Sequence, residues 1–64
     1  MDNKVFDTWT ELSQVVDGGQ EDLTRFMHGN KSAGTRLRKR MQRIKQLAQQ
    51  IRVEVQEQKN SVMA

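Results

Sequence analysis

The chain lacks cysteine and proline altogether, and its only histidine is His28. The absence of cysteine excludes disulfide bonds and zinc sites built on thiolates. The sequence also lacks a recognisable nucleophile–base pair or carboxylate cluster, which argues against an enzyme. We therefore expect no catalytic residue, no metal, no cofactor and no small-molecule substrate.

Long hydrophobic runs are missing as well. Hydrophobic residues make up 34% of the chain and charged residues 30%, so we expect no membrane-spanning segment. The first residues, Met1 to Lys4, lack the layout of a secretory signal, which predicts a cytoplasmic protein. A chain of 64 residues buries too little surface for a robust core of its own. Without disulfides, oligomerisation is the usual remedy, and we expect a homodimer.

Charge is divided unequally along the chain. Residues 1–28 hold six acids and two bases, a net charge of −4. Residues 29–64 hold nine bases and two acids, a net charge of +7. This asymmetry predicts that the two halves pack together, that the basic half meets an acidic partner, or both.

The second half has the pattern of one long helix. Apolar residues recur there at alternating spacings of four and three from Leu37 to Val55, with good helix formers between them. Asn30 is suited to cap the start of this helix through its side-chain oxygen. The pattern predicts a helix over about 31–59, followed by a disordered tail at 60–64.

The first half keeps the same spacing from Val5 to Phe26, although Gly18 and Gly19 interrupt it. Because a loop has no reason to preserve that phase, we favour one helix over about 3–27. In this interpretation Gly19 lies in the seam, where a partner backbone or Trp can approach closely. Two short helices broken at Asp17-Gly18-Gly19 remain the alternative.

A turn at about 28–30, with Gly29 in the left-handed conformation, would join the two helices as antiparallel neighbours. The predicted fold is all-α: a single-domain, two-helix hairpin that dimerises into a four-helix bundle. The residues expected in the core or dimer interface are Trp9, Leu12, Val16, Leu23, Phe26, Leu37, Met41, Ile44, Ala48, Ile51 and Val55.

The most distinctive run extends from Gly29 to Lys39, GNKSAGTRLRK, and a second run, LAQQIR, begins at Leu47. With these runs, residues 23–59 resemble the amino-terminal helical domain of the bacterial histone-like nucleoid proteins of chlamydiae and their short relatives in Bacteroidetes. Chlamydial members continue into a lysine- and alanine-rich tail, which this sequence lacks. The resemblance implies a helical, nucleoid-associated protein that compacts DNA.

The bases of the second helix fall on both sides of its apolar seam. Arginine grips phosphate in a planar fork, and a helix start favours anions, so this helix has the chemistry to contact a nucleic-acid backbone. Such contacts do not depend on base sequence. We therefore expect non-specific binding of double-stranded DNA through Asn30, Lys31, Arg36, Arg38, Lys39, Arg40, Arg43, Lys45 and Arg52.

A second hypothesis treats the same bases as the solvated rim of a bundle, partly neutralised by Glu11, Glu21 and Asp22. The protein would then be a structural dimerisation or protein-interaction module that binds no nucleic acid. The surplus of positive charge in residues 29–64 and the resemblance favour DNA binding. A phosphate loop at residues 29–35 is set aside, because the lysine precedes the second glycine and no strand leads into the run.

Overall fold

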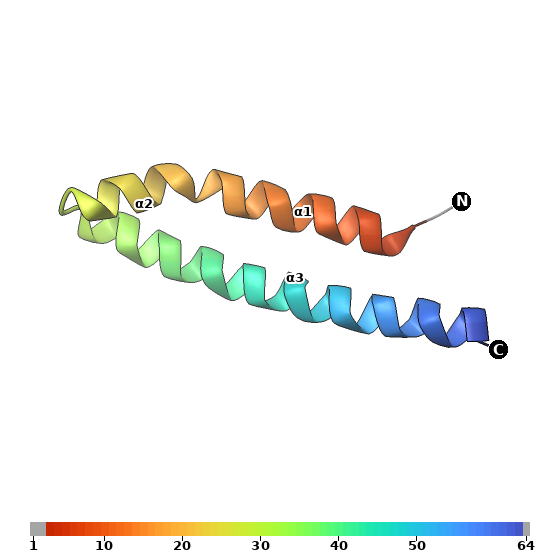
Figure 1. The fold of residues 1–64 in the computed structure, drawn as a ribbon. Coiled ribbons are helices and arrows are strands. Elements are labelled where there is room, and N and C mark those ends of the chain that lie inside the picture. The colour runs from red at the N-terminus through yellow and green to blue at the C-terminus, as the bar shows by residue number, and fades with distance from the viewer. Residues whose placement is uncertain (1–2, 64) are drawn as a thin grey trace.

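The arrangement of the chain is set by three helices that form a rod 53 Å long and 18 by 11 Å in cross-section. The computed structural model describes residues 3–63. Within that range the helices are α1 (Lys4–Gly18), α2 (Gln20–Met27) and α3 (Lys31–Met63), and there is no strand. α1 and α2 form one bent arm that runs alongside α3 in the opposite direction (Figure 1). The prediction of an all-α fold is confirmed.

α3 continues past Lys59, where the sequence pattern predicted its end. No glycine or proline follows Gly34, so nothing in the backbone chemistry interrupts the helix before Met63. The predicted disordered tail began at residue 60. The structure places residues 60–63 in α3, and Ala64 lies outside the described residues. No helix of the described part of the chain is long and apolar enough to cross a membrane.

The first arm bends at Gly19. This residue keeps right-handed backbone angles, with φ −85° and ψ −11°, and its N–H donates to the carbonyl of Val16 at 3.0 Å. α1 therefore ends at Gly18 and α2 begins at Gln20, with no change of direction large enough to separate α2 from α3 (Figure 1). The arm is one bent helix, neither the uninterrupted helix nor the loop-separated pair considered above.

The turn between the arms is built by Gly29 and Asn30. Gly29 has φ +96°, which favours glycine, and its N–H donates to the carbonyl of Phe26 at 2.9 Å. The N–H of Asn30 donates to the carbonyl of Arg25 at 3.0 Å, which completes a left-handed helix cap. The side-chain oxygen of Asn30 accepts from the N–H of Ala33 at 3.0 Å, as predicted for the cap of the following helix.

The residues between the arms recur every three or four positions on each helix. Leu47 is 1% exposed and Ala33 is fully buried, and they are the two buried apolar residues of the described chain. The sequence analysis left Leu47 out of the core. The buried or half-buried positions that share this inward spacing are Val5, Thr8, Leu12, Val15, Gly19 and Asp22 on the first arm, and Ala33, Leu37, Arg40, Ile44, Leu47, Ile51 and Glu54 on α3.

Only part of the predicted core lies between the arms. Leu12, Leu37, Ile44 and Ile51 are half-buried there. The remaining predicted core residues are exposed in a single chain: Trp9, Val16, Leu23, Phe26, Met41, Ala48 and Val55.

Six of these exposed residues share a simple relation to the inward ones. Each directly follows an inward residue, as Trp9 follows Thr8 and Val55 follows Glu54, so it is turned about 100° outward. Trp9 and Val55 line one groove, which places them on the same side of the rod. We call this side the apolar face, and its residues are Trp9, Val16, Leu23, Met41, Ala48 and Val55.

Apolar periodicity alone does not show which residues lie between the two arms. Apolar periodicity selects apolar residues, but four of the inward positions hold polar ones: Thr8, Asp22, Arg40 and Glu54. Two of them, Thr8 and Asp22, are 5% and 8% exposed. Their hydrogen bonds allow this burial, because a buried polar group without a partner is costly.

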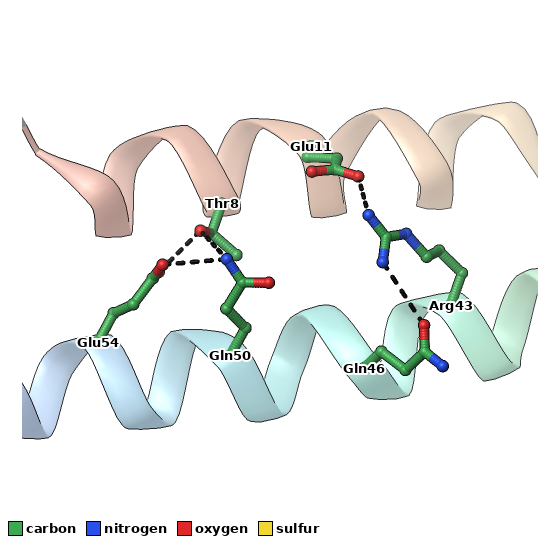
Figure 2. A network of polar contacts seen from close by, with 6 residues as sticks. All are labelled: Thr8, Glu11, Arg43, Gln46, Gln50 and Glu54. Carbon is green, nitrogen blue, oxygen red and sulfur yellow. Dashed lines mark hydrogen bonds and ion pairs between the residues drawn. The ribbon is translucent and has the colours of Figure 1, made fainter.

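A polar cluster of Thr8, Gln50 and Glu54 bridges α1 and α3 (Figure 2). The hydroxyl of Thr8 donates to Glu54 Oε1 at 2.7 Å, and Gln50 Nε2 donates to Glu54 Oε2 at 3.0 Å. These two bonds, first from Gln50 and then from Thr8, hold the pKa of Glu54 below its ordinary value of 4.5. The ionised carboxylate therefore helps to join α1 to α3.

Arg40 fills the inward side of the bend. Its Nη1 donates to the carbonyl of Val15 at 3.2 Å, and its Nε is buried with no hydrogen-bond partner among the described residues. A Cβ atom on Gly19 would lie 2.7 Å from Arg40 Cδ, and one on Gly18 would lie 2.8 Å from Nη1. The glycine pair thus admits an arginine side chain, where the sequence analysis expected a partner backbone or Trp.

We predict that Gly19→Ala and Arg40→Ala are energetically coupled. With Arg40 shortened, the nearest neighbour of a Cβ at position 19 is the Val16 carbonyl oxygen at 3.3 Å, and the higher helix propensity of alanine should stabilise the protein by up to about 0.5–1 kcal/mol. In the wild-type background the same substitution must displace Arg40 and should lose that gain. Urea unfolding of the four proteins measures the coupling, expected at about 1 kcal/mol, and additive effects would contradict the contact.

We predict that Glu54 stabilises the fold in a pH-dependent way. Because its pKa is lower in the folded state, its contribution is present above pH 4.5 and is lost as the pH falls through the folded value. The urea midpoint of the wild type should exceed that of Glu54→Gln at pH 6, and the difference should shrink as the pH falls below 4.5. Glu57→Gln, an exposed glutamate on the same helix, is the control. An advantage that grows in acid would contradict the assignment.

Candidate nucleic-acid interface

The predicted DNA-contacting residues other than Asn30 all lie on α3, and the structure divides them among three environments. Some are paired with carboxylates of the first arm, one points inward, and the others are exposed. Asn30 precedes the helix, and its side-chain oxygen is engaged in the cap described above. The environments matter because a base already held by the protein is less available to a phosphate.

One side of α3 is tied to the acids of the first arm. Arg36 Nε donates to Asp22 Oδ1 at 3.0 Å, and the Asp22 side chain is only 11% exposed. Arg43 forms an ion pair with Glu11 and donates to Gln46 Oε1 at 3.5 Å (Figure 2). These two contacts correspond to the neutralised rim weighed in the sequence analysis. Glu21, the third acid named there, pairs with Arg25 on its own helix.

Arg40 and Lys39 complete this side. Arg40 is half-buried against the bend, whereas the sequence analysis expected it to contact DNA. Lys39 is exposed and forms no ion pair with a carboxylate of residues 3–63. It lines a shallow groove together with Val15, Arg36, Arg40 and Arg43. Lys39 is therefore the one base of this groove that is neither paired nor inward-facing in the described chain.

The other side of α3 carries a regular series of bases. These bases are exposed and recur every seven residues, and none is paired with a carboxylate in the described part of the chain. Seven residues advance a helix by about 10.5 Å, so the series extends over about 42 Å. We call it the cationic row, and its members are Lys31, Arg38, Lys45, Arg52 and Lys59.

Lys59 was missed by the sequence analysis, which assigned only the first four members to DNA contact. The signal was present, because Lys59 follows Arg52 by the same seven residues. The bases are densest between Arg36 and Lys45, and Lys59 stands apart from that run. Density along the sequence does not measure availability on a helix, where neighbouring residues point in different directions.

The row is bordered by uncharged residues. On a helix, the neighbours of each row member lie three and four residues away along the chain. Between Gly34 and Gln56 these neighbours form two further series, each of which also recurs every seven residues. One belongs to α3's part of the apolar face and includes Met41, Ala48 and Val55. The other consists of exposed polar side chains, namely Thr35, Gln42, Gln49 and Gln56. A phosphate approaching the row would therefore meet hydrogen-bonding amides and no carboxylate on its flanks.

Residues that could hold a metal ion are not grouped anywhere in the described chain: no three His, Cys, Asp or Glu residues of residues 3–63 come together. His28 lies at the end of α2, where its Nδ1 is 2.8 Å from the carbonyl of Thr24. The exposed bases and amides of α3 offer positive charge and hydrogen-bond donors.

Comparison with known proteins adds the family. The model of a family described as histone H1-like protein Hc1 matches residues 6–61. Comparisons with curated proteins and with solved structures found no match. The family match confirms the resemblance to histone-like nucleoid proteins, and it extends that resemblance through most of the first arm. The chain belongs to the family of the histone H1-like protein Hc1.

Proposed function

We propose that this protein binds double-stranded DNA in the bacterial nucleoid and contacts the phosphate backbone without sequence preference. The observation that carries the proposal is the match to a histone H1-like family over residues 6–61. Histone-like proteins package DNA and are not a family of enzymes. The surplus of bases on α3 supports the same function, since phosphate contacts supply most of the affinity in non-specific binding.

The lack of sequence preference follows from the kind of surface available. Recognition of base edges requires a helix or a ribbon presented so that it can enter the major groove. Here α3 is 33 residues long and is paired with the first arm over much of its length. The exposed bases on its side suit the sugar-phosphate backbone, which every duplex presents alike.

We also propose that the functional unit is a homodimer in which two helical hairpins form a four-helix bundle. Two fully buried apolar residues in the described chain are too few to stabilise a domain of this size. Meanwhile Trp9 is 58% exposed, and the rest of the apolar face lies beside it. A second copy carries an identical face, so twofold symmetry lets the two faces cover each other.

The dimer would carry two sets of α3 bases. This doubles the phosphate contacts available to one molecule, and bases on separated surfaces could bridge two duplexes. The competing hypothesis, a structural module that binds no nucleic acid, uses the same dimer but leaves the bases in solvent. The two hypotheses differ in whether the protein binds DNA at low salt.

We predict that affinity for unrelated duplexes falls with the same steep salt dependence. With about four to six phosphate contacts per dimer, the slope of log K against log salt concentration should be about −4 to −5, at about −0.9 per contact. Mobility shifts or fluorescence anisotropy with several unrelated duplexes measure it. Binding confined to one sequence would contradict the proposal, and no binding at low salt would favour the structural module.

We predict that the apolar face holds the dimer together. Val16→Glu combined with Met41→Glu puts two carboxylates in the middle of this face and should weaken dimerisation more than about a hundredfold. Analytical ultracentrifugation should then show the mass of one chain, with reduced helicity by circular dichroism. Gln42→Glu combined with Gln49→Glu adds the same charge at exposed sites off the face and should leave the dimer intact. Dimers that survive in the first variant would contradict the proposed interface.

A further inference from the structure

We propose that the cationic row alone, and not both sides of α3, is the surface that meets DNA. This inference rests on the proposed DNA binding and assigns it to Lys31, Arg38, Lys45, Arg52 and Lys59. The bases on the opposite side of α3 then act mainly within the protein, where they fasten the two arms together.

The arginines on the opposite side of α3 are already engaged within the protein. Arg36 Nε and Arg43 Nη2 are held by Asp22 and Glu11, so a phosphate that binds these nitrogens must displace a carboxylate, although the two side chains are 48% and 47% exposed. The displaced carboxylate would remain within a few ångströms and repel the phosphate. Arg40 is half-buried and its Nη1 donates to the carbonyl of Val15, so it too is engaged within the protein.

The bases of the cationic row are in a different environment. Its five members are exposed, and none is paired with a carboxylate in the described chain, so binding costs no internal ion pair. A strict interval of seven keeps them on one side of α3, with a drift of about 20° per interval in a straight helix. The row therefore presents a nearly straight line of charge, about 42 Å long, to a rod-like partner.

The surface beside the row is uncharged. Thr35, Gln42, Gln49 and Gln56 form an adjoining exposed series without an acid among them. Hydroxyl and amide groups donate hydrogen bonds to phosphate oxygens and sugars in the same contacts that bases make. A cationic line next to a neutral, hydrogen-bonding line is suited to duplex DNA, whereas a protein partner of the row would need a matching acidic helix.

The location of the row also agrees with the proposed dimer. Arg38, Lys45 and Arg52 lie three residues before Met41, Ala48 and Val55, so the row runs along the edge of the apolar face. Long basic side chains can cover the edge of an apolar contact with their stems while their charged ends remain in water. Each copy in the dimer can thus keep its row available to DNA.

Protection of lysines in the wild-type protein tests the inference directly. The row contains Lys31, Lys45 and Lys59, whereas Lys4 and Lys39 are exposed bases outside it. Acetylation of the dimer with and without an excess of a random-sequence duplex at low salt, followed by mass spectrometry, compares the two groups. We expect DNA to slow acetylation of the row lysines severalfold and to leave Lys4 and Lys39 nearly unchanged. Protection of Lys39 equal to that of the row would overturn the inference.

Charge-matched variants provide the second test. Arg38→Gln, Lys45→Gln and Arg52→Gln together should reduce the magnitude of the salt slope by about 0.9 per lost contact, or about 2.7 of the predicted 4 to 5 when the row of one chain lies on the duplex. Arg36→Gln, Lys39→Gln and Arg43→Gln remove the same charge from the opposite side and should leave the slope within about 1 of the wild type. Circular dichroism confirms that each variant is folded at the binding temperature.

The outcomes separate the inference from the proposed function. If the wild type binds duplexes but both triple variants lose slope equally, DNA binding stands and the assignment to one side is wrong. If the opposite-side variant is the one that loses slope, the assignment is reversed. If the wild type binds no duplex at low salt, both the proposed function and this inference fail. Loss of slope in the row variant alone supports the inference.

Discussion

The structure depends on one constraint: four of the thirteen positions where the first arm and α3 face each other are polar. Thr8, Asp22, Arg40 and Glu54 occupy places that apolar residues would fill in an ordinary helical pair. Thr8, Asp22 and Glu54 form hydrogen bonds with side chains of the opposite arm, and Arg40 Nη1 donates to the carbonyl of Val15 while its Nε has no partner among the described residues. The contact is therefore specific, but it buries little apolar surface. The apolar residues that follow these positions are therefore displaced outward, and a single chain cannot bury them.

The pairing of the two arms also determines which bases of α3 are held in ion pairs. The acids of the first arm hold Arg36 and Arg43 on one side of α3, which leaves the bases of the cationic row as the surplus. The net charge of +7 in residues 29–64 thus overstates what is available to a partner, because part of it serves the fold. The proposed dimer surface and the proposed DNA-binding surface lie side by side along α3, so the two proposals are compatible with each other.

Much of this could be predicted from the sequence, and the failures are informative. Helical periodicity located the helices and the turn, since apolar spacing, Gly29 and Asn30 are local signals. Periodicity could not show which apolar stripe lies between the arms, because Val16 and Ala48 continue one stripe as well as Val15 and Leu47 continue the other. Choosing between the stripes requires knowing that Thr8 bonds to Glu54 and that Arg40 lies against Gly19. Those contacts join residues far apart in the chain, so they cannot be predicted from composition or from spacing along the sequence.

Quenching of Trp9 fluorescence by acrylamide tests the central claim, that the apolar face is open in one chain and closed by a second. Trp9 is the only tryptophan, so its signal is unambiguous. The measurement follows quenching across a dilution series while light scattering reports the molar mass. The account predicts ready quenching where the mass is that of one chain and strong shielding where it is that of two. Shielding at the mass of one chain, or full accessibility at the mass of two, would contradict it.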